Sequence, residues 1–198
     1  KANDGPVSRH LNRPISTFLS RHLAGTRITP NQISLACFGL SVLAAAIMLY
    51  PAYPALLAGG LLAQLASIVD GCDGEVARLK WQQSAYGGWL DAVLDRYADA
   101  MLLSAMAMHA FFASGSIVPV AWGFAAVTGA LVLSYTADKY DGLMRERIAS
   151  RWRLGRDVRM LVLCIGAILN QPLATLVVIA LLMNMEVLRR LVVCRDTD

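Results

Sequence analysis

Six long apolar stretches alternate with polar segments along the 198-residue chain. They occupy residues 33–50, 55–69, 89–112, 117–137, 158–170 and 172–188. Each is long enough for a membrane-spanning helix once its polar ends are included, because a span needs about 20 mostly apolar residues. We therefore predict an all-α integral membrane domain of six transmembrane helices over residues 29–198. Thr29 and Pro30 fit its start as the N-cap and the first helical residue.

Residues 1–28 form a different kind of segment, a juxtamembrane linker with an amphipathic helix. Between Ser8 and Leu23 the apolar residues recur at helical spacing, and arginines occupy other positions of the helical wheel. The apolar set is Leu11, Ile15, Phe18, Leu19 and Leu23. This pattern predicts an interfacial helix with its basic face toward lipid headgroups. A solvated helix packed on another domain is the alternative.

The composition and the placement of charge support a membrane protein. Hydrophobic residues make up 57% of the chain, against about half in a soluble domain. All 18 Lys and Arg residues lie in four segments: before the first span, between Arg78 and Arg96, between Lys139 and Arg159, and after Glu186. The other connections, 51–54, 113–119 and 170–172, carry none. By the positive-inside rule we expect a multi-pass protein of the cell (inner) membrane with both termini and the active site cytoplasmic. A soluble helical protein would carry charge on every loop.

Four aspartates lie where spans two and three meet the cytoplasmic side. Asp70 and Asp73 are three residues apart and Asp91 and Asp95 are four apart, so each pair shares one helix face. A short loop joins the two predicted helices, which brings the pairs together. Four facing carboxylates repel one another strongly unless positive charge lies between them.

An all-oxygen set of ligands predicts a hard divalent cation, Mg²⁺ or Mn²⁺, and four acids are enough to hold two ions. Such a site fits phosphoryl transfer. Gly74 and Ala77 leave bare helix surface for a ligand, and Arg78 can pair with phosphate. A proton relay or the ion site of a cation-coupled transporter is the alternative, although transporter sites usually lie near the midplane. Asp99, one turn beyond Asp95, either supports the ligands or packs between helices.

The motif Asp70-x-x-Asp73-Gly74-x-x-Ala77-Arg78-x(8)-Gly87-x-x-x-Asp91-x-x-x-Asp95 resembles the signature of the CDP-alcohol phosphotransferases. The resemblance implies a homodimeric membrane enzyme that transfers a substituted phosphate from a CDP-linked donor to an alcohol and releases CMP. It implies that the four aspartates hold two divalent ions, Mg²⁺ or Mn²⁺, and that Asp91 and Asp95 are catalytic, with Asp95 as the general base. It further implies a CDP pocket lined by Gly74, Ala77, Arg78 and Gly87.

A second basic cluster surrounds the junction of spans four and five. Within it, Lys139, Arg156 and Arg159 are candidates for binding a phosphate on the acceptor, since arginines can converge with a helix N-terminus on a phosphate. The alternative is that these residues only signal topology or bind anionic lipid. We expect an acceptor such as inositol phosphate or glycerol phosphate, a lipid bilayer as surroundings, and no nucleic-acid partner.

Two shorter runs are similar to one branch of the same family. They are Asp4–Ser16 and Gly155–Arg159. In that branch a cytosolic inositol-1-phosphate cytidylyltransferase domain is fused upstream, and the membrane domain joins CDP-inositol to inositol 1-phosphate, giving di-myo-inositol phosphate phosphate. The non-methionine start fits a domain cut from such a fusion. The alternative is a phospholipid synthase that uses CDP-diacylglycerol with inositol phosphate or glycerol phosphate.

Overall fold

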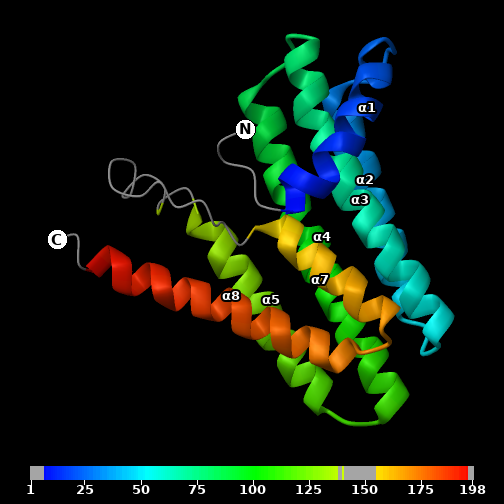
Figure 1. Cartoon of the computed structure of the whole chain (residues 1–198), viewed down its shortest axis with the longest axis vertical. Helices are drawn as coiled ribbons and strands as arrows, with labels where there is room; N and C mark the ends of the chain where they lie inside the picture. The colour runs from blue at the N-terminus through cyan, green and yellow to red at the C-terminus, as the bar shows by residue number, and fades with distance from the viewer. Residues whose placement is uncertain (1–6, 138–139, 141–154, 196–198) are drawn as a thin grey trace.

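Every element in the described part of the chain is a helix (Figure 1). The computed structural model describes residues 7–137, 140 and 155–195. The elements are a short π-helical turn η1 (Ser8–Asn12) followed by α1 (Arg13–Ala24), α2 (Pro30–Met48), α3 (Tyr53–Leu79), α4 (Ala85–Ser114), α5 (Val118–Tyr135), α7 (Arg156–Ile168) and α8 (Pro172–Arg195). The predicted all-helical class is thus confirmed for these residues.

Each of the six predicted apolar stretches lies on one helix, from α2 to α8. The main difference is in α3, which continues to Leu79, ten residues past the apolar stretch, so that Asp70 and Asp73 lie inside the helix rather than at its end. Within the described residues α2, α3 and α5 are long and apolar enough to cross a membrane.

The start of α2 follows directly from its sequence. The Thr29 side chain accepts a hydrogen bond from the Gln32 backbone nitrogen, and the Gln32 side chain accepts one from the Thr29 nitrogen at 3.0 Å. Pro30 occupies the first turn, where no backbone N–H is needed. This capping box confirms the predicted helix start and determines where α2 begins.

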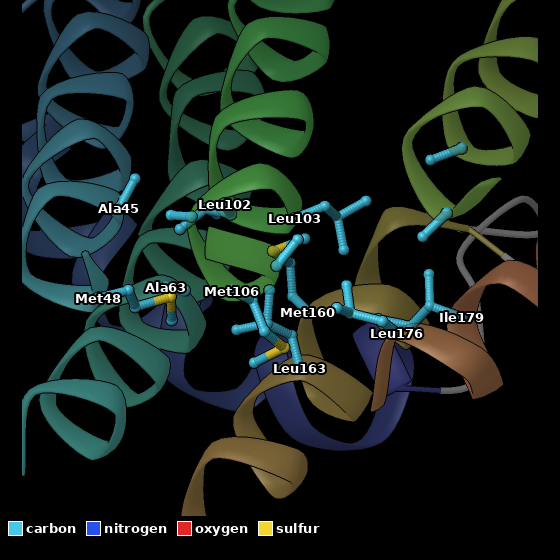
Figure 2. Close-up of a cluster of buried hydrophobic side chains, with 14 of the residues drawn as sticks. Ala45, Met48, Ala63, Leu102, Leu103, Met106, Met160, Leu163, Leu176 and Ile179 are labelled. Carbon is cyan, nitrogen blue, oxygen red and sulfur yellow. The ribbon is translucent and has the colours of Figure 1, made fainter. Parts of the chain in front are cut away.

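The helices pack as an interleaved bundle (Figure 1). α2 packs on α3 and α4, α5 packs on α4 and α8, and α7 packs on α3 and α8. Figure 2 shows the core between them, to which α2, α3, α4, α7 and α8 all contribute. The labelled core residues are Ala45, Met48, Ala63, Leu102, Leu103, Met106, Met160, Leu163, Leu176 and Ile179. This core fixes the positions of α3, α4 and α7, whose ends carry the polar site.

Helix α1 lies against α3 through a polar face. Ser16 and Ser20 are buried there, as is Asn12 at the end of η1, and the Gln64 amide nitrogen on α3 donates to the Asn12 side-chain oxygen at 3.2 Å. Arg13 pairs with Glu75 of α3 at 2.5 Å. In contrast, Leu11, Ile15 and Phe18 from the predicted apolar set are exposed, and Leu19 and Leu23 pack beside a small core cluster.

We expect Gly60→Ala to destabilise the fold. Gly60 lies on α3 against α7, and an added Cβ would overlap the Cβ of Ala167, which has no flexible side chain that could move aside. Overpacking of this kind costs about 1–3 kcal/mol. The matched control is Gly39→Ala on α2, where an added Cβ meets open space. Thermal unfolding in detergent should show a lower midpoint for Gly60→Ala alone, and equal midpoints would contradict this packing.

Candidate active site

Two helices bring three aspartates together at one end of the bundle. One carboxylate oxygen from each of Asp70, Asp91 and Asp95 lies within 4.8 Å of the other two. Asp70 comes from the second half of α3, whereas Asp91 and Asp95 come from the first half of α4. All three are partly buried, so water screens their mutual repulsion only in part.

Asp73, the fourth predicted ligand, lies outside that group of three. Its Oδ2 accepts a hydrogen bond from the Ser34 hydroxyl on α2 at 2.6 Å, and its Oδ1 accepts one from the backbone nitrogen of Gly74. Ser34 is buried, so this contact holds the Asp73 carboxylate at the α2–α3 junction. The sequence analysis missed Ser34, because a serine in an apolar stretch gives no sign of the helix it faces.

Arg156, at the start of α7, supplies positive charge to the carboxylates. Its Nη1 lies 2.8 Å from Asp70 Oδ2 and 2.6 Å from Asp95 Oδ1. Its Nε lies 3.2 Å from Asp99 Oδ1. The guanidinium therefore contacts carboxylates from both α3 and α4, which joins the start of α7 to the motif.

Arg159 lies one turn further along α7, and its side chain is only 3% exposed. Its Nη2 donates to Asp99 Oδ2 at 2.6 Å and its Nη1 donates to the Ala130 carbonyl of α5 at 3.0 Å. In this arrangement the guanidinium faces buried protein groups. Lys139, the third residue predicted at the acceptor phosphate, lies outside the described residues.

The residues expected to line the CDP pocket lie beside the aspartates in the chain and on the same two helices. Gly74 and Arg78 are adjacent on α3, since a Cβ at Gly74 would lie 3.5 Å from Arg78 Nη1. Gly87 lies in the first turn of α4, where its nitrogen donates to the capping Ser84 hydroxyl at 2.9 Å. All these contacts are within the protein, and the role of these residues in binding CDP remains a prediction.

The donor chemistry fits a hard divalent cation. Asp70, Asp91 and Asp95 offer only carboxylate oxygen, the ligand type that Mg²⁺ and Mn²⁺ prefer. Their spacing lets three oxygens approach one centre. A divalent ion would also offset the repulsion among them more completely than one guanidinium does.

Comparison with known proteins identifies the family. The sequence model of the CDP-alcohol phosphatidyltransferase family matches residues 27–194. The chain belongs to this family. The family and the transferase class expected from the aspartate motif are therefore both confirmed.

Two bacterial relatives match nearly the whole chain. A protein named bifunctional IPC transferase and DIPP synthase from Rubrobacter xylanophilus is 45% identical over 96% of this chain and 42% of its own length. A protein of the same name from Aquifex aeolicus is 40% identical over 93% of this chain and 43% of its own length. The chain thus spans less than half the length of these curated relatives.

A solved structure shares the fold. The crystal structure of Mycobacterium tuberculosis phosphatidylinositol phosphate synthase (PgsA1) with CDP-DAG bound matches with a TM-score of 0.75 and 20% identity. The match covers 91% of this chain and 94% of that one. At this level of identity the likeness establishes the helical fold alone.

We expect Ser34→Ala to raise the Mg²⁺ concentration that transfer requires. The change removes the hydroxyl that donates to Asp73, so that the carboxylate keeps its contact with the Gly74 nitrogen but loses its contact with α2. Loss of a supporting hydrogen bond to a metal ligand typically costs about 10–100-fold in metal affinity or activity. The measurement is the Mg²⁺ concentration that gives half-maximal transfer.

Ser41→Ala is the matched control for this prediction. Ser41 is also buried on α2, but its hydroxyl donates to the Cys37 carbonyl within the same helix at 3.0 Å. The Mg²⁺ requirement should shift for Ser34→Ala only. An equal response of the two variants would show that the Ser34–Asp73 bond has no bearing on the metal site.

Proposed function

We propose that the chain transfers a substituted phosphate from a CDP-linked donor to a phosphorylated alcohol and releases CMP. The observation that carries this proposal is the meeting of the Asp70, Asp91 and Asp95 carboxylates with the Arg156 guanidinium at one end of the bundle. The preferred reaction joins CDP-inositol to inositol 1-phosphate and gives di-myo-inositol phosphate phosphate. The similarity to two proteins named DIPP synthase supports this choice.

The four aspartates would hold the divalent ions, with Ser34 fixing Asp73. Two Mg²⁺ or Mn²⁺ ions would neutralise the donor pyrophosphate and stabilise the charge on departing CMP. Asp95 takes the proton of the acceptor hydroxyl, with Asp91 beside it, and the oxygen attacks the phosphorus distal to cytidine. The bond from that phosphorus to the CMP oxygen breaks.

The remaining motif residues bind the two substrates. Gly74, Ala77 and Gly87 give the CDP group close access to the helix backbone, and Arg78 pairs with its phosphates. Arg156, together with Lys139, binds the phosphate on the acceptor. Because Arg156 Nη1 lies 2.6 Å from Asp95 Oδ1, a phosphate held by this arginine lies beside the group that takes the proton. The Arg159 guanidinium binds Asp99, which in turn contacts Arg156.

We also propose the membrane arrangement expected from the sequence. The six helices α2–α8 span the cell (inner) membrane with both termini and the site on the cytoplasmic side, and two copies form a dimer. The exposed Leu11, Ile15 and Phe18 support an interfacial position for α1, since apolar side chains on such a helix can enter the lipid boundary. We further propose an upstream fusion to a cytidylyltransferase domain, which is supported by the bifunctional names of these relatives together with their greater length.

A phospholipid synthase that uses CDP-diacylglycerol is the second candidate. The shared fold with a phosphatidylinositol phosphate synthase crystallised with CDP-DAG favours it. In that case the carboxylates and Arg156 keep the roles proposed above, and only the group attached to the distal phosphate of the donor differs. A cation-coupled transporter is a remote third reading, and it would release no CMP.

The test is CMP release by the purified chain with Mg²⁺ or Mn²⁺ and inositol 1-phosphate, comparing CDP-inositol with CDP-diacylglycerol. Release from CDP-inositol alone supports the preferred reaction. Release from CDP-diacylglycerol alone assigns the chain to phospholipid synthesis. No release from either donor would contradict the proposed acceptor and leave the transporter reading in place.

A further inference from the structure

Asp99 is a buried acid that lies outside the aspartate motif. It is on α4, one helical turn beyond Asp95, and only 2% exposed. Its two oxygens bind two different arginines: Oδ1 accepts from Arg156 Nε at 3.2 Å, and Oδ2 accepts from Arg159 Nη2 at 2.6 Å. Asp99 therefore connects the two arginines of α7, one of which also contacts Asp70 and Asp95.

Arg159 ties this pair to a third helix. Its Nη1 donates to the Ala130 carbonyl at 3.0 Å and to the Ser134 hydroxyl at 3.4 Å, both on α5. A buried charge pair is a weak source of stability, because desolvation of both groups offsets their attraction. The Asp99–Arg159 pair thus calls for an explanation other than stability.

We propose that Asp99 and Arg159 are positioning residues, which fix the Arg156 guanidinium beside Asp70 and Asp95. The proposal rests on the proposed function, in which Arg156 binds the acceptor phosphate. It assigns Asp99 to support of the site, and it assigns Arg159 to holding Asp99 rather than to contact with the phosphate.

The geometry explains why two contacts are needed. Asp70 and Asp95 both bind Nη1, so by themselves they fix one corner of the planar guanidinium and leave the plane free to rotate. Asp99 binds Nε on another edge, and two separate attachment points set the orientation of the plane. Nη2, the one guanidinium nitrogen without a carboxylate in these contacts, then faces in a fixed direction, from which it can donate to the acceptor phosphate.

The variant for the test is Asp99→Asn combined with Arg159→Met. Asp99→Asn alone would leave the Arg159 charge buried without its partner, which is strongly destabilising, whereas removal of both charges keeps the net charge and is often tolerated. The paired variant is made in the wild-type chain and in Arg156→Gln. Asn184→Ala is the control for lost packing, because the Asn184 amide also joins a neighbouring helix to α5, donating to the Ala125 carbonyl at 3.1 Å.

The first readout is the affinity of the purified chain for Mn²⁺, measured in the absence of donor and acceptor. The electron paramagnetic resonance signal of free Mn²⁺ reports how much of the ion remains unbound. Without Asp99, Arg156 rests on Asp70 and Asp95 alone and competes more strongly for their oxygens. We expect Mn²⁺ affinity to fall about tenfold in the wild-type background and to stay unchanged in the Arg156→Gln background. An equal fall in both backgrounds, or in Asn184→Ala, would overturn the positioning role.

The second readout is steady-state transfer to inositol 1-phosphate. The paired variant should raise the acceptor KM about tenfold and leave the donor KM unchanged, and it should add nothing once Arg156 is replaced. A loss of kcat with both KM values unchanged would overturn the proposal. If the wild-type chain releases no CMP, the proposed function fails, and the Mn²⁺ coupling still decides whether Asp99 positions Arg156.

Discussion

We expect Asp95→Asn to lower the rate of CMP release by about 10²–10⁴-fold while the chain keeps its affinity for the CDP-linked donor. The amide has nearly the same shape as the carboxylate, but it cannot take a proton from the acceptor hydroxyl. Asp95 belongs to the group of three carboxylates and lies against Arg156, so the change removes the base where the acceptor is expected to bind. The rate is measured in single-turnover reactions with saturating donor.

Glu186→Gln is the matched control for this change. Glu186 is a buried carboxylate that is also paired with arginine, but it lies on α8, where its partners are Arg189 and Arg190. Its substitution should leave the rate near that of the wild type. Turnover retained in Asp95→Asn, or lost equally in both variants, would rule out Asp95 as the general base.

We expect that removal of divalent ions with a chelator will abolish transfer and that added Mg²⁺ or Mn²⁺ will restore it. Three carboxylates within 4.8 Å of one another repel both the donor pyrophosphate and each other, and a single guanidinium offsets only part of that charge. The ions are expected to supply several kcal/mol of transition-state stabilisation, or about 10²-fold or more in rate.

The control is the same chelator saturated with Mg²⁺ beforehand, which should leave the rate unchanged. Recovery should need the carboxylates, so that Asp70→Asn requires more Mg²⁺ than the wild-type chain for half-maximal rate. Full turnover in excess chelator would show that the carboxylates serve another purpose, such as a proton relay.

The helices and the aspartate motif could be predicted from the sequence because both depend on local periodicity. Residues three or four apart lie on one face of a helix, so Asp70 shares a face with Asp73 and Asp91 shares one with Asp95, independently of how the helices pack. The structure brings Asp70, Asp91 and Asp95 together, and it also shows a contact that the sequence did not predict, between Asp73 and Ser34. That difference depends on how α2 packs against α3, which periodicity does not determine.

The contacts of α7 and α1 depend on packing between distant segments. Asp99 and Arg159 are 60 residues apart, and neither carries a local sign of the other. In η1 and α1 the apolar pattern indicated Leu11 and Phe18, whereas the face buried against α3 includes polar residues, with Asn12 bound to Gln64. Small polar side chains allow close helix contact, but a sequence pattern gives them little weight.

Transfer to a phosphorylated alcohol is tested most directly by a phosphorus NMR time course of the purified chain with Mg²⁺, CDP-inositol and inositol 1-phosphate. We expect the pyrophosphate signals of the donor to decline while a phosphodiester signal and the CMP signal grow in equal amounts, and we expect no such change with Asp95→Asn. CMP formed together with free inositol phosphate and no diester would indicate hydrolysis instead of transfer. Such a result, or an unchanged donor spectrum, would contradict the proposed transfer from CDP-inositol to inositol 1-phosphate.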